Sequence, residues 1–258
     1  SDNFSYYGGG ISNGGRATIT NCTLKGNIAN DGGGIANFDT VALTNCALTG
    51  NTASNNGGGM DNSGSAATTI DCTVSGNSAL EGGGIYNSGS TLTLTNCTVS
   101  ENSANYGGAI KNISTATLTN CILWGDNSVK GFLEISGGGS TNVTYSDIQQ
   151  KGFTSAGNIY ANPIFVDASD GNLQIEPDSP AVDAGDNAAV PSGVLTDLAG
   201  NNRFQDVPTS AHSGLGTAPI VDMGAYEATA ALAASAGGTY VVLPGGSVQL
   251  MGLGASDV

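Results

Sequence analysis

Residues 82–104 read GGGIYNSGSTLTLTNCTVSENSA, and five versions of this stretch follow one another along the first half of the chain. Each version opens with a glycine-rich segment that an apolar residue closes, and each carries one cysteine further on. The closing residues are Ile11, Ile35, Met60, Ile85 and Ile110, and the cysteines are Cys22, Cys46, Cys72, Cys97 and Cys121. Two independent markers share a spacing of 24 to 26 residues, so the chain contains an internal repeat.

The repeat favours strands over helices. Apolar and polar residues alternate in segments such as 91–95 (TLTLT), which is the period of a β-strand, and the abundant Gly, Asn, Thr and Ser disfavour a helix. The leucine framework of a leucine-rich repeat is absent from the sequence. We therefore predict a parallel β-solenoid, in which each repeat forms one coil and successive coils stack about 4.8 Å apart.

The sequence also predicts a corner in each coil. Leu94, Cys97 and Val99 cannot all point inward from one straight strand, because side chains alternate between its two faces. A left-handed backbone at Asn96, which asparagine tolerates, would reset the alternation. The same position is occupied in the other coils by Asn21, Asn45, Asp71 and Asn120.

Two further columns contain an asparagine in every coil. The first consists of Asn13, Asn37, Asn62, Asn87 and Asn112, and the second of Asn27, Asn51, Asn77, Asn102 and Asn127. Stacked amides can hydrogen-bond from coil to coil, so we interpret both columns as structural ladders.

The cysteines are odd in number and occupy the same position of each coil. Parallel side chains on stacked coils hold neighbouring Cβ atoms further apart than a disulfide prefers. We therefore predict a buried column of free thiols that pack as small apolar side chains.

The repeat resembles the right-handed parallel β-helices of bacterial surface proteins, in particular the GGxI…N repeats of polymorphic outer-membrane proteins. The resemblance covers about residues 6–128, where whole columns recur. It implies that the solenoid is right-handed, which the spacing alone does not determine.

The second half of the chain departs from the repeat. It contains the segments GNIYANPIFVDASDGNLQI (157–175), EPDSPAVDAGDN (176–187), TDLAGNNRF (196–204) and VDMGAYE (221–227). Their order resembles the choice-of-anchor Q regions of exported bacterial β-helix proteins, which have no agreed enzymatic activity. The segment 237–250 resembles the first strands of a PKD or Ig-like module, but the chain stops too soon to complete such a sandwich.

These observations predict an all-β chain: a right-handed parallel β-helix with irregular C-terminal coils and a β tail. We expect five regular coils over residues 1–128. Irregular coils and a capping region would follow over 129–227, where they would close one end of the rod. Residues 228–258 would form a linker and a β-strand tail, which is either a truncated PKD or Ig-like module or a donor strand.

Composition excludes several classes of partner. Six Lys and Arg stand against 21 Asp and Glu, for a formal net charge of −15, so the surface would repel nucleic acid. No apolar run approaches the ~20 residues that span a bilayer. No secretory leader opens the sequence, so we expect any signal peptide to lie outside this chain.

We expect no enzymatic activity. A hydrolase of the two-carboxylate type needs acidic side chains on one face, yet the acidic residues of the five coils occupy different slots. His212 is the only histidine and lies in a loop rich in Gly, Ser and Pro, without the motif that exposes a nucleophilic serine.

A metal ion is the one cofactor that the sequence suggests. The acidic turns that contain Asp167, Asp170, Asp183 and Asp186 could bind calcium, which prefers several oxygen ligands from short loops. The alternative is that these aspartates form Asx turns, in which each side chain bonds its own backbone. No other cofactor is expected.

We therefore expect a non-catalytic extracellular segment of a prokaryotic surface protein, with a structural or adhesive role. Stacking surfaces favour self-association, either end to end into fibres or by donation of the strand 240–250 to a neighbour. Cell-surface glycans or matrix are the other expected partners. The alternative hypothesis is a carbohydrate-active enzyme, similar to β-helical polysaccharide lyases and hydrolases, or a glycan-binding β-helix.

Overall fold

A computed structural model describes residues 4–131, 134–153, 157–208 and 210–229. The predicted linker and β-strand tail lie almost entirely outside the described residues, so the donor-strand hypothesis is not addressed by the structure. Within the described residues the chain is built from short strands, and the two helices are single 3₁₀ turns, η1 (Ala168–Asp170) and η2 (Asn187–Ala189).

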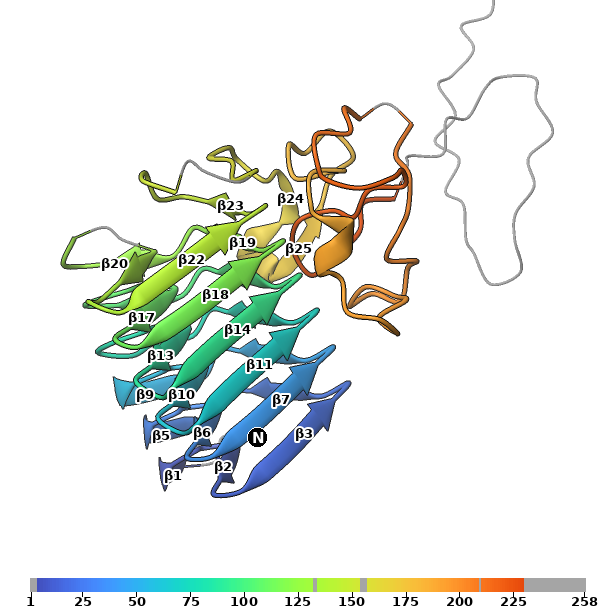
Figure 1. Ribbon diagram of the computed structural model, residues 1–258. Helices are drawn as coiled ribbons and strands as arrows, with labels where there is room; N and C mark the ends of the chain where they lie inside the picture. The colour runs from blue at the N-terminus through green and yellow to red at the C-terminus, as the bar shows by residue number, and fades with distance from the viewer. Residues whose placement is uncertain (1–3, 132–133, 154–156, 209, 230–258) are drawn as a thin grey trace, which may run out of the picture.

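Six coils stack along one axis, and each contributes one strand to each of three six-stranded parallel sheets (Figure 1). Sheet 1 contains β2 (Ile11–Asn13), β6 (Ile35–Asn37), β10 (Met60–Asn62), β13 (Ile85–Asn87), β17 (Ile110–Asn112) and β21 (Ile135–Ser136). Sheet 2 contains β3 (Arg16–Thr20), β7 (Thr40–Thr44), β11 (Ala66–Ile70), β14 (Thr91–Thr95), β18 (Thr115–Thr119) and β22 (Ser140–Thr144). Sheet 3 contains β4 (Thr23–Lys25), β8 (Ala47–Thr49), β12 (Thr73–Ser75), β15 (Thr98–Ser100), β19 (Ile122–Trp124) and β23 (Asp147–Ile148).

A less regular fourth side completes the coils. It consists of β1 (Phe4–Tyr7), β5 (Ile28–Asp31) and β9 (Thr52–Asn56), then β16 (Ser103–Ala104) and β20 (Asn127–Ser128), with single bridges at Ser78 between them. The sixth coil, formed by β21, β22 and β23, shows that the regular register extends beyond residue 128.

Each coil begins with glycines, which can adopt backbone conformations and close contacts that other residues cannot. Gly82 has a φ of +64°, a left-handed conformation that L side chains rarely adopt. At Gly83 an added Cβ would lie 2.5 Å from the Ser103 carbonyl oxygen and 2.6 Å from that of Gly108. The backbones of successive coils pack too closely here for any side chain, which explains the glycine-rich opening of every repeat.

The predicted corners are confirmed. Left-handed φ angles of 49° to 55° occur at Asn21, Asn45, Asp71, Asn96 and Asn120. In the sixth coil Tyr145 takes this position with a φ of 47°. The corners place Leu94, Cys97 and Val99 together in the core, where all three are fully buried. The cysteines are free thiols as predicted, and all except Cys22 are buried.

Both asparagine ladders are present. In the first, each Nδ2 donates to the Oδ1 of the next coil over 2.7–2.8 Å, from Asn13 to Asn112. In the second, the bonds of 2.9–3.0 Å run from Asn27 to Asn102. The fifth member is not Asn127, as we expected, but Asp126, whose Oδ1 accepts from Asn102 Nδ2 over 2.7 Å. The ladder position directly follows the left-handed Gly125, whereas Asn127 begins strand β20 and is exposed.

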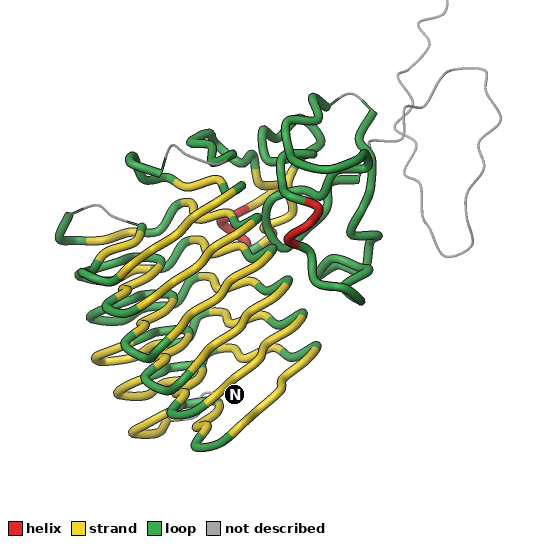
Figure 2. Tube along the Cα trace, viewed as in Figure 1, coloured by secondary structure: helices red, strands yellow, loops and turns green. Residues whose placement is uncertain are grey.

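After the sixth coil the chain changes direction. Asn158 and Ile159 bond to the last coil, at Ser146 and Asp147, so this short segment covers part of the end of the rod. The antiparallel pair β24 (Phe165–Asp167) and β25 (Asn172–Ile175) follows. Residues 181–208 and 210–228, which are loops apart from η2, then lie beside the rod (Figure 2), which differs from simple closure of its end. They form a second apolar core with Ile122 of β19.

Candidate functional site

The C-terminal loops contact the corners of the third, fourth and fifth coils, and we call this contact the flank junction. Backbone groups of the loops bond to the corner of the fifth coil and to β15 of the fourth coil. Asn120 donates from Nδ2 to the Asp186 carbonyl over 3.0 Å and accepts from the Asp186 amide over 2.7 Å. The Ala225 amide donates to Thr98 Oγ1 over 3.0 Å. Residues far apart in the sequence are thereby held side by side.

Arg203 forms the centre of the flank junction. Its side chain is fully buried, and its Nη2 donates to the Gly224 carbonyl over 2.5 Å. Its Nε lies 3.6 Å from Asp71 Oδ1 at the corner of the third coil and 3.4 Å from Glu227 Oε1. The guanidinium therefore joins the corner of the third coil to the segment that contains Gly224 and Glu227, and a buried charge of this kind is stable only with its partners present.

Several carboxylates surround this single guanidinium. Burial raises the pKa of Asp71 to about 6 and that of Asp222 to about 7, although Arg203 acts in the opposite direction on both. Burial and the neighbouring Asp222 carboxylate raise the pKa of Glu227 well above its usual value. Asp222 and Asp197 accept backbone N–H bonds from Asp183, Ala228, Ala199, Asn201 and Glu227. These bonds hold the backbone of the C-terminal loops in place.

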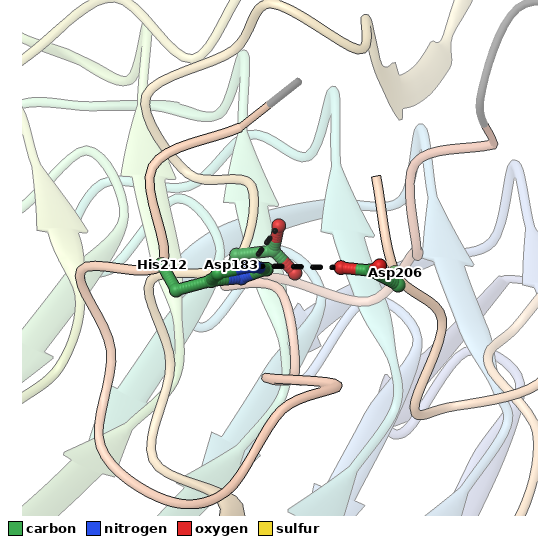
Figure 3. A group of neighbouring side chains, drawn as sticks. All are labelled: Asp183, Asp206 and His212. Atoms are coloured by element: carbon green, nitrogen blue, oxygen red, sulfur yellow. Dashed lines mark ion pairs between the residues drawn. The ribbon is translucent and has the colours of Figure 1, made fainter. Parts of the chain in front are cut away.

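A second group of ionisable side chains lies at the outer edge of these loops (Figure 3). His212 Nδ1 is 3.3 Å from Asp183 Oδ2, and His212 Nε2 is 3.6 Å from Asp206 Oδ1. Asp183 is fully buried, whereas the His212 and Asp206 side chains are 42% and 47% exposed. We call these three residues the Asp–His cluster; it is the group within the described part of the chain whose ligating atoms lie close enough to share a metal ion.

The Asp–His cluster does not have the geometry of a serine hydrolase. The Ser210 hydroxyl donates to Asp183 Oδ2 and not to the imidazole of His212. A nucleophilic serine needs the histidine as its base, so a proton could not be removed along this path. A pocket of about 490 Å³ adjoins the cluster and is lined in part by Pro177, Ser210 and Ser213.

Among the described residues, the four aspartates that the sequence suggests for calcium do not form one group of close ligand atoms. Asp167 is exposed and caps η1, accepting from the Asp170 amide over 3.2 Å and from Ser169 Oγ over 2.7 Å. Asp186 caps η2 by accepting from the Ala188 amide over 2.9 Å. These are the bonds of the Asx-turn alternative. Of the four, only Asp183 belongs to the Asp–His cluster, and calcium binding by the set remains a prediction.

Sequence reasoning did not find Asp206, Arg203 or the pairing of His212 with acidic residues. No motif spacing connects them, because irregular loops bring them together. Their best signal is compositional: Arg203 is one of only two basic residues after residue 131, among many acidic ones.

Comparison with known families agrees with the architecture described above. A family model described as "Right handed beta helix region" matches residues 5–177, about two thirds of the chain. The chain belongs to the right-handed β-helix family. The match includes all six coils and the β24–β25 pair, and it supports the right-handed winding expected from the sequence.

No curated protein and no solved structure matches the chain. Membership of the right-handed β-helix family fixes the architecture and leaves the activity open, because a fold alone does not determine function. Among the described residues, no helix has the length and apolar character needed to cross a membrane.

Proposed function

We propose that this right-handed β-helix is a non-catalytic structural element of an exported surface protein, in which the coils form a rigid stalk or spacer. The observation that carries the proposal is the pair of continuous asparagine ladders. Each ladder amide is buried and bonds to the next coil, so polar side chains inside the rod serve cohesion.

The use of the charged residues supports the same proposal. The buried ionisable groups of the flank junction bond to backbone groups and to Arg203, and through these bonds they order the loops. Within the described part of the chain, the basic residues of the coils are few, and Lys111 pairs with Glu81 over 3.9 Å on the surface. The chain has few charged residues, and most of them are acidic. We propose an extracellular location for the rod.

Mechanical unfolding tests the stalk directly. The chain is pulled between tags at its two ends in single-molecule force measurements. If coils open one at a time, each 24- to 25-residue coil should release about 80–90 Å of extended chain. A featureless extension at low force would contradict a load-bearing role.

A parallel assay tests the absence of catalysis. The chain is incubated with acidic and neutral polysaccharides, and new reducing ends and unsaturated products are measured. We expect neither product, and release of either one above a heat-inactivated control would overturn the non-catalytic assignment.

Glycan binding is the second candidate, and one observation favours it. The rings of Trp124 and Tyr160 lie 5.9 Å apart, and the side chain of Tyr160 is 56% exposed. Tyr160 lines a pocket of about 340 Å³ together with Gln150, Lys151 and Phe153. Exposed aromatic rings bind the apolar faces of sugars. Binding to a glycan array that Tyr160→Ala abolishes would support this adhesive role, and unchanged binding would exclude this surface.

A further inference from the structure

The Asp–His cluster joins three separate loop segments at the edge of the C-terminal loops. One ligating atom from each of Asp183, Asp206 and His212 lies within 4.8 Å of the other two. Figure 3 shows both carboxylates directed toward the imidazole. We propose that these three residues bind a divalent transition-metal ion, with Zn²⁺ as the preferred ion.

The spacing of the ligands is close to that of a metal site. Ligands held about 2.0–2.2 Å from a tetrahedral zinc ion lie roughly 3.3–3.6 Å from one another. His212 Nδ1 lies 3.3 Å from Asp183 Oδ2, and His212 Nε2 lies 3.6 Å from Asp206 Oδ1, so each carboxylate is at such a separation from a different ring nitrogen. A single ion takes only one nitrogen of the ring, so the imidazole must shift. The exposure of His212 and Asp206 leaves room for that shift.

An unsatisfied buried atom gives independent support. Asp183 is fully buried, and its Oδ1 has no hydrogen-bond partner. A buried carboxylate oxygen without a partner is costly, and a cation would remove that cost. The backbone holds this carboxylate in place: the Asp183 amide donates to Asp222 over 2.7 Å, and its carbonyl accepts from Ser213 and Gly214. The rigid ligand therefore has one oxygen without a partner, Oδ1, whereas Oδ2, the oxygen nearest to His212, also accepts from the Ser210 hydroxyl.

The donor set selects the class of ion. Calcium takes six to eight oxygen ligands and seldom uses imidazole, whereas zinc accepts one histidine and two carboxylates with a position left for water. Magnesium likewise prefers oxygen ligands and water. The formal net charge of −15 also favours a cation at this edge of the molecule.

A bound ion would connect Asp206 and His212 to the buried Asp183. It would thereby fix the exposed segments that carry Asp206 and His212 to the flank junction. Ligand binding that is specific to the folded state raises stability by mass action. The inference therefore predicts a measurable effect on unfolding that does not depend on any catalytic activity.

The test uses the full chain with Cys22→Ser as the background, because the exposed Cys22 thiol could itself bind zinc. After chelator treatment, Zn²⁺ alone is titrated by calorimetry, and thermal unfolding is followed with and without the ion. We expect saturable binding of one ion per chain and a higher Tm. Co²⁺ in place of Zn²⁺ should give the visible absorption bands of a nitrogen- and oxygen-bound ion.

Two conservative variants at exposed positions, Asp206→Asn and His212→Gln, should weaken binding by at least tenfold, since changes even to residues that only support metal ligands typically cost roughly 10–100-fold. Asp178→Asn, an exposed aspartate beside the same pocket, is the matched control and should bind as the background does. Equal Tm values of all variants without metal would show that folding is intact.

Three results would overturn the proposal. The first is the absence of saturable Zn²⁺ binding, which would leave the cluster as an ion pair. The second is Zn²⁺ binding that both variants retain, which would place the ion elsewhere. The third is a Ca²⁺-induced Tm increase without one for Zn²⁺, which would favour the oxygen-only calcium hypothesis.

Discussion

The guanidinium of Arg203 lies 3.6 Å from the carboxylate of Asp71, and both side chains are fully buried. Asp71 stands at the corner where the other four of the first five coils have asparagine, so the third coil differs from its neighbours at the place where the C-terminal loops attach. A carboxylate at this one corner provides the charge that the incoming arginine requires.

Replacement of Arg203 should therefore loosen the C-terminal loops. Arg203→Met leaves Asp71 and Glu227 buried without their cation, and loss of one partner of a buried ion pair costs about 3–5 kcal/mol. Limited proteolysis after residue 157 and chemical unfolding measure the effect. Adding Asp71→Asn to Arg203→Met should recover part of the loss. A loss in the double variant equal to the sum of the losses in Arg203→Met and in Asp71→Asn alone would show that the two side chains are not coupled.

Interruption of an asparagine ladder should destabilise the rod. Asn62 accepts from Asn37 and donates to Asn87 Oδ1 and to the Thr91 carbonyl. In Asn62→Ala these buried groups lose their partners, at a cost of about 2–4 kcal/mol. Thermal unfolding is the measurement, and Asn55→Ala, at an exposed position of β9, is the control. A loss no larger than that of the control would mean that the ladder contributes little.

Variants at a corner residue should show whether the corner depends on backbone conformation or on side-chain hydrogen bonds. Asn45 has a φ of 51°, and its Oδ1 has no hydrogen-bond partner. Asn45→Gly should leave the free energy of unfolding within about 0.5 kcal/mol, because glycine adopts this conformation freely. Asn45→Val should lose about 1–2 kcal/mol, since a β-branched residue is strained there. Equal behaviour of the two variants would contradict the backbone explanation.

Stability should increase on mild acidification. Burial raises the pKa of Asp147 to about 7, and its Oδ2 has no hydrogen-bond partner. The folded chain therefore binds a proton more tightly than the unfolded chain. This contribution is complete below the unfolded pKa near 4, and it is lost as the pH rises through about 7. Burial raises the pKa of Asp61 to about 6 in the same direction.

Asp147→Asn separates this contribution from the rest. Asparagine keeps the acceptor for the Ala161 amide but carries no charge, so the variant should gain about 2–4 kcal/mol over the wild type at pH 9 and little at pH 4. Urea unfolding across this range measures the difference. Asp178→Asn controls for the removal of one acidic charge. A gain that is the same at both pH values would rule out the titration of Asp147.

The thiols should differ in reactivity. Cys22 is exposed, whereas Cys46, Cys72, Cys97 and Cys121 are buried. Burial raises the pKa of Cys72 and of Cys97 well above the usual thiol value, which keeps both in the less reactive form. A maleimide should label one thiol in the native chain and all five in the unfolded, unreduced chain. Fewer than five in the second case would indicate disulfides.

The regular coils could be predicted from the sequence because their determinants are local and repeat. Gly82, Ile85 and Asn96 have equivalents one period away, and each column reports the same slot of the coil. The error at Asn127 arose where Asp126 takes the role of asparagine in a Gly-Asp-Asn segment. Aligning each ladder residue on the left-handed residue before it identifies Asp126.

The flank junction and the Asp–His cluster could not be predicted in this way. Arg203 reaches Asp71 across most of the chain, and no period relates the two positions. Asp183 and His212 meet because backbone bonds join the segment 183–185 to the segment 213–215, and Asp206 approaches them from a third segment. Such contacts depend on tertiary packing. From the residue types alone, only the excess of acidic side chains in this half of the chain could be recognised.

The ladder bonds also have a direction. Every amide from Asn27 to Asn102 donates toward the next coil along the chain, so their dipoles add along the rod and the positive end meets the Asp126 side chain. At the ladder position, each coil therefore presents an amide oxygen to the preceding coil and an amide N–H to the following coil, so any two coils are complementary there. Insertion or deletion of a whole repeat by unequal recombination would leave the remaining ladder bonds able to form. The length of the rod can therefore evolve in steps of one repeat.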